Sequence, residues 1–320
     1  MSIRRQKSIR DKLFSTFAYQ REKNALKYTT NIKDYELISP LGGVDDISYL
    51  YLSRFQGLYV ALKFTDLTIC SNYALLEDVI ASVRNSCSLR HPNILPYYKC
   101  FVENERLWIV TIPMKLGSIR NILNKEYKTG FSEVVVATLL REVLKGLDYL
   151  HIQESCHNDI RCENILIDST GEVCLTGLHH MKKKSFDFVG EIEWSAPEVL
   201  DQHTLHGTPA DIYSFGATAV EMAFGKTGFE NWPAMKVLRA KLHYVLPPPM
   251  LDSNGKMSKS FHDMINACLQ RDPSRRPTAN ALLEHQFFKQ ARSSTFLKSY
   301  FNKEDSNSRP KLDAYPEESQ

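Results

Sequence analysis

The sequence predicts a two-lobed α+β fold, in which a small antiparallel β-sheet with one main helix precedes a larger α-helical lobe. One observation is the pattern of residues 34–113, where short runs of aromatic and β-branched residues are broken by glycines. Another is the helical spacing of apolar residues that begins after Gly117. We therefore expect one domain over 34–291, divided into an N-lobe at 34–113 and a C-lobe at 114–291.

The expected N-lobe contains five short strands and one helix. The strands are expected at residues 35–38, 48–52 and 58–64, from about 94 onward, and at 107–111. Residues 73–89 carry a helical mixture of side chains, and the RHPNI sequence that follows ends the helix, because a proline disfavours helical backbone in the residue before it. Pro113 and Gly117 then mark the link to the second lobe.

The expected C-lobe contains a long helix with Ser132 as its N-cap. Apolar residues form one stripe along this helix: Val136, Leu139, Leu140, Val143, Leu144, Leu147 and Leu150. Short apolar runs at 165–167 and 173–175, joined through the turn sequence DSTG, indicate a β-hairpin. We expect this hairpin to present residues 157–164 at one end and Gly177 at the other.

The composition is that of an ordinary globular protein, with 43% hydrophobic and 24% charged residues among 320. No run of 18 apolar residues occurs and the N-terminus reads MSIRRQK, so we expect no membrane span and a location in the cytoplasm, and also in the nucleus. The net charge of +3 gives no support to nucleic-acid binding. The seven cysteines form no C-x-x-C pair and are expected to be reduced, mostly buried thiols.

Two terminal segments lie outside the expected domain. Residues 1–33 concentrate nine lysines and arginines, which predicts a basic N-terminal arm. A solvated tail is the simpler interpretation of this arm, and a docking or membrane-surface segment is the alternative. Residues 292–320 are rich in polar side chains and are expected to form a C-terminal tail.

Two motifs carry the chemistry of the expected C-lobe. The sequence HNDIRCEN at 157–164 resembles the catalytic loop of protein kinases, H-R-D-x-x-x-x-N, with Asp159 and Asn164 at its two functional positions. In that family the Asp accepts the proton of the substrate hydroxyl and the Asn holds a magnesium ion. The family's metal-binding D-F-G motif is replaced by a triplet that begins with Gly177. Glycine has no side-chain oxygen, so we expect no metal ligand there and a vestigial Asp159.

The order and spacing of further motifs extend this resemblance over some 250 residues. Lys63 ends a VALK sequence that is similar to the V-A-I-K strand of kinases, whose Lys contacts nucleotide phosphates. The resemblance implies a bilobal protein-kinase fold with nucleotide contacts from Gly42, Val44, Lys63, Thr111 and Met114. It also implies structural roles for Asp211, as a cap on the catalytic loop, and for an ion pair between Glu198 and Arg276.

Other departures from the kinase pattern concern the nucleotide and its regulation. The sequence GGVDDISY at 42–49 keeps only the first glycine of the phosphate-covering loop, and its two aspartates would repel a triphosphate. The helix position that should pair with Lys63 is Ser82, and Asp78, one turn away, is the alternative partner. Asn158 replaces the Arg that clamps an activation-loop phosphate, while Asp187 and Glu191 replace threonines, so a phosphorylation switch is not expected.

The sequence resembles two branches of the germinal-centre group of protein kinases. The sequence LTGL at 175–178 resembles the STRAD pseudokinases, the sterile-twenty-related kinase adaptors, which carry a G-L-R type triplet in place of D-F-G. The sequences FVG at 188–190 and PAMKVL at 233–238 are similar to SPAK and the oxidative-stress-responsive kinases, which are active on ion cotransporters.

The changes at Gly177, in the glycine loop and at Ser82 favour the STRAD interpretation. It implies an adaptor that allosterically activates a Ser/Thr master kinase of the liver-kinase-B type together with a Mo25-class helical-repeat scaffold. It further implies cytoplasmic localisation of that kinase and downstream AMP-activated-kinase and polarity signalling. ATP is expected to bind without magnesium dependence. The alternative is a divergent but active SPAK-like kinase, with Asp159 as base and Asn164 holding one metal ion. The W-E-F tail that STRADs use on the scaffold is missing from the end of this chain.

Overall fold

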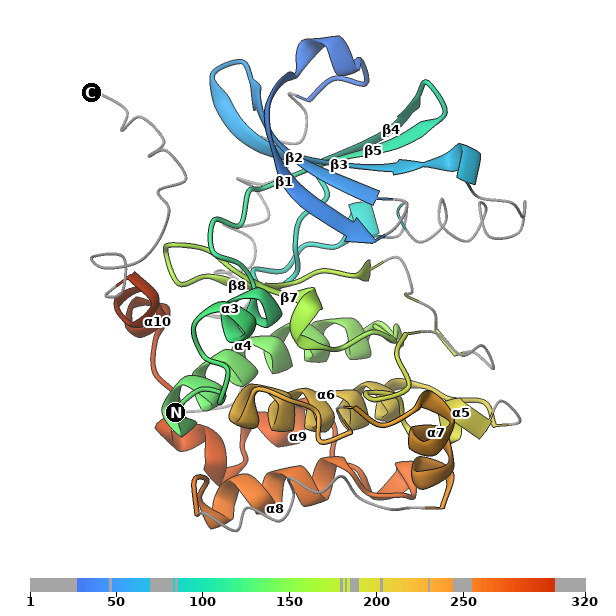
Figure 1. Ribbon diagram of the computed structural model, residues 1–320, viewed down its shortest axis with the longest axis vertical. Helices are drawn as coiled ribbons and strands as arrows, with labels where there is room; N and C mark the ends of the chain where they lie inside the picture. Colours follow the sequence, from blue (N-terminus) through green and yellow to red (C-terminus); the bar gives the residue numbers. More distant parts are fainter. Residues whose placement is uncertain are drawn as a thin grey trace, which may run out of the picture.

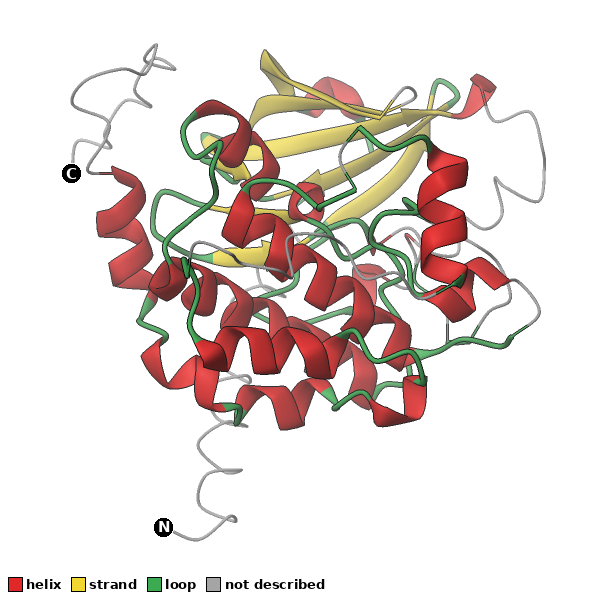
Figure 2. Cartoon of the chain, turned by 60° about the horizontal axis from the view of Figure 1, so that its bottom comes forward, coloured by secondary structure: helices red, strands yellow, loops and turns green. Residues whose placement is uncertain are grey.

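A computed structural model describes residues 28–45, 48–69, 83, 86–178, 181, 183–184, 190–201, 204–229, 231–243 and 255–302. For residues 42–45 it describes the backbone alone. These residues form two lobes, with the large sheet in one and most helices in the other (Figures 1 and 2). The structure confirms the predicted α+β fold class.

The N-lobe is a five-stranded antiparallel sheet with the order β1-β2-β3-β5-β4. Its strands are β1 (Glu36–Asp45), β2 (Ser48–Phe55), β3 (Leu58–Asp66), β4 (Lys99–Glu103) and β5 (Arg106–Thr111). The fourth strand begins later than the sequence indicates, because Ile94 instead forms a parallel bridge with Leu175 of the C-lobe. The predicted helix at 73–89 falls mostly outside the described residues, of which 83 and 86–88 are helical.

Aromatic side chains dominate the N-lobe core. Tyr35 and Phe55 stack with their ring centroids 4.8 Å apart, and the buried ring of Tyr28 lies 5.2 Å from Phe55. Such ring pairs add to the free energy gained from burying their area. Tyr28 belongs to the predicted basic arm, so the last residues of that segment pack against the sheet.

The C-lobe is built around two buried helices, α4 (Glu133–Ile152) and α6 (Thr208–Phe224). The apolar stripe predicted along α4 is fully buried and forms the centre of the C-lobe core. Ser132 occupies the N-cap position with extended backbone, although its side chain makes no capping hydrogen bond. The remaining helices of this lobe are α3 (Ile119–Lys125), α5 (Pro197–Asp201), α7 (Ala234–Leu242), α8 (Lys259–Cys268), α9 (Ala279–Leu283) and α10 (Ser294–Asn302).

A small antiparallel sheet lies where the two lobes meet (Figure 1). Its strands are β6 (Gly117–Ser118), β7 (Ile165–Ile167) and β8 (Val173–Leu175). The predicted hairpin is the pair β7 and β8. Leu95 of the N-lobe side donates its backbone N–H to Leu175 over 2.8 Å, and Leu175 donates to Asn93 over 2.9 Å. The hairpin is therefore fixed to the chain segment that enters the N-lobe sheet.

The predicted polar tail begins with a helix. In α10 the side chains of Leu297 and Phe301 are buried, and Phe301 meets the ring of Phe131 edge to face at 5.8 Å. The two residues are four apart and lie on one helix face, which is how a short amphipathic helix attaches to a core. Among the described helices, none is both long enough and apolar enough to cross a membrane.

Candidate functional site

The catalytic-loop motif and Gly177 lie side by side at the open end of the β7–β8 hairpin. The backbone N–H of Thr176 donates to the carbonyl oxygen of Asn164 over 2.9 Å. The motif precedes the first strand of the hairpin and Gly177 follows the second, and an antiparallel hairpin brings these two positions next to each other. The structure thus gathers Asp159, Asn164 and Gly177 into one site.

Asn164 is held by Asp159. Its side-chain amide nitrogen donates to the backbone carbonyl of Asp159 over 2.8 Å and to the carboxylate Oδ2 over 2.6 Å. Both residues are buried, with 8% of Asn164 and 7% of Asp159 exposed. A buried amide that already has two acceptors is costly to move, because its hydrogen bonds would be lost without replacement by water.

Gly177 has a left-handed backbone with φ of +80°. A Cβ atom at this position would lie 2.6 Å from Cγ of Asn164 and 2.7 Å from its amide nitrogen and oxygen. Atoms in that range overlap, and a non-glycine residue also disfavours positive φ. The amide of Asn164 therefore fills the space in which a side chain at position 177 would begin.

The carboxylate of Asp159 is closed in from its other side. Its Oδ1 lies 3.1 Å from Nε of Arg161, with which it forms an ion pair. A Cβ atom at Gly190 would lie 3.2 Å from the same oxygen, so the activation segment, which is the stretch between Gly177 and α5 (Pro197–Asp201), approaches it closely at Gly190. Asp159, expected to be vestigial or, in the alternative, a base, thus has Asn164 and Arg161 as side-chain partners and the backbone of Gly190 close to its carboxylate.

Asp211, at the start of α6, holds the backbone of the catalytic loop. Its Oδ2 accepts from the N–H of His157 and its Oδ1 from the N–H of Asn158, both over 2.8 Å. Nε2 of His151 lies 2.9 Å from Oδ2. Burial acts to raise the pKa of Asp211, but its hydrogen bonds and electrostatic interactions with His151 and His157 outweigh this effect, so the pKa lies below its ordinary value.

His157 is a buried neutral imidazole. Its Nε2 lies 2.7 Å from the carbonyl oxygen of Thr176, and its Nδ1 accepts from the N–H of Asp159 over 3.3 Å. A ring with one donating and one accepting nitrogen is uncharged. Burial accordingly lowers the pKa of His157, although Asp211 and Asp159 act in the opposite direction. The ring links the catalytic loop to the residue before Gly177.

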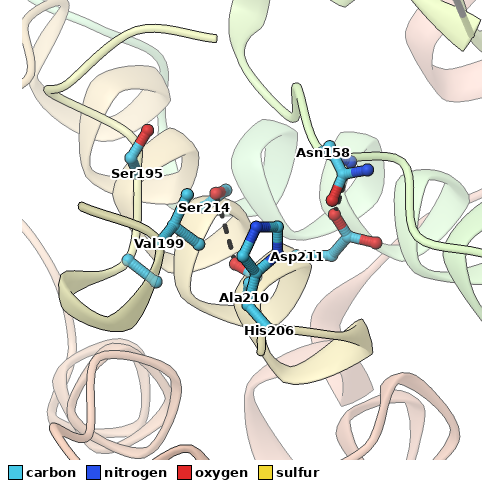
Figure 3. Close-up of a pocket in the computed structure, with 8 residues that line it drawn as sticks. Asn158, Ser195, Val199, His206, Ala210, Asp211 and Ser214 are labelled. Atoms are coloured by element: carbon cyan, nitrogen blue, oxygen red, sulfur yellow. Dashed lines mark hydrogen bonds between the residues drawn. The ribbon is translucent and has the colours of Figure 1, made fainter. Parts of the chain in front are cut away.

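The activation segment contacts the start of α6 around a small pocket (Figure 3). Its lining comes from the catalytic loop, α5 and its approach, and α6: Asn158, Ser195, Ala196, Val199, His206, Ala210, Asp211 and Ser214. The pocket has room for about one water molecule, far less than a nucleotide needs. It is a packing gap beneath the catalytic loop.

Residues predicted to contact a nucleotide lie in the N-lobe sheet and after it. Lys63 is in β3, between Leu50 of β2 and Ile109 of β5. The buried hydroxyl of Thr111 donates to the carbonyl of Pro96 over 2.7 Å, and the carbonyl of Met114 accepts from the N–H of Gly117 over 3.0 Å.

Several other predicted residues lie wholly or partly outside the described structure. The backbone of Gly42 pairs with Leu50 in the β1–β2 ladder, and Val44 belongs to β1, but the side chain of Val44 is not among those described. Ser82, Asp78 and Asp187 lie outside the described residues altogether. The partner expected for Lys63 and the expected activation-loop substitution at 187 therefore remain predictions.

The described residues do not fit a kinase magnesium site. They include no group of three or more His, Cys, Asp or Glu side chains arranged to hold a metal ion. Gly177 provides no carboxylate, and the amide of Asn164 is turned toward Asp159. A divalent cation of this kind takes several oxygen ligands, usually including carboxylates.

Glu198 and Arg276 form a buried two-pronged ion pair in the C-lobe. The two nitrogens Nη1 and Nη2 of Arg276 lie 2.5 and 2.8 Å from the carboxylate oxygens of Glu198. Arg276 also donates to the backbone carbonyls of Pro209, Gln270 and Arg271. All five guanidinium N–H groups thus have acceptors, which is the condition for keeping such a charge buried.

The sequence analysis did not identify a further buried carboxylate, Glu221, in the last turn of α6. It forms an ion pair with Arg120 of α3, and its Oε2 accepts from the indole N–H of Trp194 over 2.7 Å. Arg120 also binds Glu163 of the catalytic loop over 3.0 Å. Burial raises the pKa of Glu221 to about 7, although Arg120 acts to lower it. The signal in the sequence is a single acid inside the apolar run ATAVEMAF.

Lys241 of α7 is a second residue that the sequence did not mark. Its ammonium group donates to the backbone carbonyls of Glu193 and Ser195 over 2.6 and 2.8 Å. Burial lowers its pKa to about 7, against the attraction of Glu193. Lys241 therefore attaches the activation segment to α7. Trp194 attaches the same segment to α6 and α3.

Comparison with known proteins places this architecture in a family. The protein kinase domain family matches residues 45–288. The chain is 40% identical over 281 residues to the serine/threonine-protein kinase fray2 of Dictyostelium discoideum, an alignment that covers 84% of this chain and 27% of the relative. It is 34% identical over 266 residues to germinal center kinase 3 of Caenorhabditis elegans, covering 74% of this chain and 44% of the relative.

A relative named as a kinase adapter is similar over a larger share of its own length. The chain is 32% identical over 315 residues to the STE20-related kinase adapter protein alpha of Mus musculus, covering 80% of this chain and 73% of the relative. By contrast, the chain spans half or less of the length of fray2 and germinal center kinase 3. A protein kinase domain implies ATP binding, and the lobes described above are those of that domain. The chain belongs to the protein kinase family, with relatives in the STE20 and germinal-centre kinase group.

Proposed function

We propose that this chain is a pseudokinase adaptor. It binds a Ser/Thr master kinase of the liver-kinase-B type, together with a Mo25-class helical-repeat scaffold, and stabilises the active conformation of that kinase. The observation that carries the proposal is the site around Gly177, where the amide of Asn164 occupies the position of a missing metal-binding side chain. An adaptor needs a fixed surface and no phosphoryl transfer, and this site is fixed by hydrogen bonds and closed.

The activation segment also supports a binding role, because several contacts hold its described part in place. Its described part is attached by Lys241, by Trp194 and by the close approach of Gly190 to Asp159. These contacts involve charged and aromatic side chains of the chain itself. A surface that is ordered before it meets its partner loses less conformational entropy on binding.

The mechanism of such an adaptor is a population shift. A partner kinase that exchanges between inactive and active conformations is activated by any protein that binds the active one more tightly. A preference of about 1.4 kcal/mol shifts the ratio of the two conformations about tenfold. The similarity to STE20-related kinase adapter protein alpha supports this role.

Peptide phosphorylation by the purified master kinase tests the proposal. The kinase is assayed alone, with this chain, with the scaffold, and with both. We expect the chain to raise the rate by about tenfold or more when the scaffold is present, and to label no peptide when it is incubated alone. A phosphorylation rate that is the same with and without the chain would contradict the adaptor proposal.

The second candidate function is a divergent Ser/Thr kinase of the SPAK-like type. It is favoured by the retention of Asp159 and Asn164 and by the 40% identity to the kinase fray2. This candidate requires Mg²⁺ to bind with ATP. A thermal shift by ATP that appears only with Mg²⁺ and is lost in Lys63→Met would support it. A shift of equal size without any divalent ion supports the adaptor, with ATP as a regulatory ligand.

A further inference from the structure

The two half-buried cysteines of the N-lobe lie together. Cys87 is in the helical segment 86–88 and Cys100 is in β4, thirteen residues later. Their sulfur atoms are 3.0 Å apart and share a hydrogen bond. We propose that Cys87 and Cys100 form a reversible disulfide under a hydroperoxide oxidant, and that this bond clamps the end of the N-lobe helix to β4.

The surroundings of the pair distinguish its two thiols. The hydrogen bond with Cys100 lowers the pKa of Cys87, and the positive charges of Arg90 and Lys99 lower it further, against the effect of burial. The guanidinium of Arg90 is close by, since it donates to the carbonyl oxygen of Cys87 over 2.5 Å. The pKa of Cys100 is raised by the same hydrogen bond and by burial. Cys87 is therefore the attacking thiolate and Cys100 the resolving thiol.

The remaining described cysteines have different surroundings. Cys156, Cys162, Cys174 and Cys268 are buried, and burial raises the pKa of the thiols of Cys156, Cys162 and Cys268. Buried, protonated thiols react slowly with oxidants and alkylating agents. Among the described cysteines, the pair at 87 and 100 thus combines partial exposure, a lowered thiol pKa and a second sulfur within reach.

The reaction takes place in two balanced steps. The thiolate of Cys87 attacks one oxygen of hydrogen peroxide, the O–O bond breaks, and the hydroxide that leaves takes a proton to become water. The sulfenic acid formed on Cys87 is then attacked by the sulfur of Cys100, whose proton leaves with the displaced hydroxide as a second water molecule. Two thiols thereby lose two electrons, one peroxide gains them, and one S–S bond forms.

The geometry requires little movement. A disulfide has an S–S length of roughly 2.05 Å, so sulfurs that start 3.0 Å apart approach by about 1 Å. Both side chains pack against a cluster that joins the N-lobe to β8, including Val83, Leu95, Tyr97, Ile109 and Cys174. A bond in this position ties the helical segment 86–88 to the part of the N-lobe that packs against β8.

The effect of the bond is a tighter N-lobe. It closes a loop between residues 87 and 100 that contains the link between the helix and β4. Cross-linking a loop of this size restricts the unfolded chain, and we expect the oxidised protein to melt about 5 °C above the reduced protein. This inference is independent of the proposed adaptor role, since it concerns the N-lobe of the isolated chain.

Peptide mapping of the full chain without reduction tests the proposal. The purified protein is treated with hydrogen peroxide, the free thiols are blocked with an alkylating agent, and the cross-linked peptides are identified by mass spectrometry. We expect a Cys87–Cys100 peptide that disappears on treatment with a phosphine reductant. Recovery of both cysteines alkylated, or a cross-link from Cys87 to Cys70 instead, would overturn the proposal.

Two serine variants provide the controls. In Cys100→Ser the oxidised Cys87 has no resolving thiol, so a sulfenic-acid probe should label Cys87 and the rise in melting temperature should vanish. The matched variant Cys268→Ser changes a buried cysteine outside the pair and should leave both the cross-link and the temperature shift unchanged. A shift that persists in Cys100→Ser would show that a different modification causes it.

Discussion

The side-chain amide of Asn164 lies where the side chain of residue 177 would begin in a kinase with a metal-binding aspartate, 2.6 Å from an ideal Cβ on Gly177. The amide is held there by the backbone carbonyl and the carboxylate of Asp159. The position of Asn164 therefore depends on the absence of a side chain at Gly177.

Restoring the aspartate should not restore the site. In Gly177→Asp the new side chain meets Asn164 and the backbone must keep a positive φ, a conformation that costs roughly 1–2 kcal/mol for a non-glycine residue. We expect a lower free energy of unfolding by at least that amount and no gain of peptide phosphorylation. Urea unfolding followed by circular dichroism and a kinase assay measure the two effects.

A double variant separates the overlap with Asn164 from the backbone strain. In Gly177→Asp combined with Asn164→Ala, the overlapping amide is absent, so the loss of stability from the aspartate should be smaller than in the wild-type background. The matched substitution Gly57→Asp also places a side chain at positive φ, but no atom lies within 4 Å of its Cβ. Equal losses at Gly177 and Gly57 would contradict an overlap with Asn164.

Glu221 gives the protein a pH dependence near neutrality. Its pKa is about 7 in the folded chain and 4.5 in the absence of burial, so the folded state binds the additional proton between these values. The free energy of unfolding therefore falls as pH rises from 4.5 to 7, at a slope of up to about 1.4 kcal/mol per pH unit from this group. Glu221→Gln cannot titrate, and its curve should lack this contribution.

The measurement is denaturant unfolding of both proteins at several pH values. The difference in the free energy of unfolding between wild type and Glu221→Gln should change by about 3 kcal/mol between pH 4.5 and 7. The wild type should become less stable relative to the variant as the pH rises. A difference that stays constant would mean that Arg120 keeps the carboxylate charged throughout.

The ion pair of Arg276 should not tolerate lysine. A lysine has three donors on one atom and cannot reproduce the five bonds that Arg276 makes to Glu198 and three backbone carbonyls. We expect Arg276→Lys to lower the free energy of unfolding by about 3 kcal/mol. The neighbouring Arg275→Lys is the control, since its side chain is 75% exposed, and it should change stability by less than about 0.5 kcal/mol. Similar losses in the two variants would refute this account of the pair.

Much of the fold could be read from the sequence because periodic burial is a local property. The stripe along α4 and the apolar runs of β2, β3 and β5 each identify their element without knowledge of its neighbours. The start of β4 could not be placed in this way. Ile94 is apolar like a strand residue, but its partner is Leu175, some eighty residues away in the other lobe. The helix α10 was hidden for a related reason, since only two of its nine residues are buried.

The sequence predicts which residues belong to the candidate site, but it does not predict how their side chains are arranged. Motif spacing identified Asp159, Asn164 and Gly177 as one functional group. The sequence could not show that Asn164 turns toward Asp159, because this depends on the space left empty by Gly177 in three dimensions. Glu221 and Lys241 were missed because a single charged residue within a helix normally lies in solvent. Their burial depends on Arg120, Trp194 and the carbonyls of the activation segment.

The measurement that tests the central claim most directly is peptide phosphorylation by the reconstituted mixture of master kinase, scaffold and this chain, comparing wild type with Asp159→Asn. If the chain is an adaptor, both versions raise the activity of the master kinase equally, and neither labels peptide when incubated alone. Melting curves of the two versions verify that both are folded. If the activity is lost with Asp159→Asn while the variant remains folded, the chain transfers phosphate itself despite Gly177, and the account of a closed, metal-free site is contradicted.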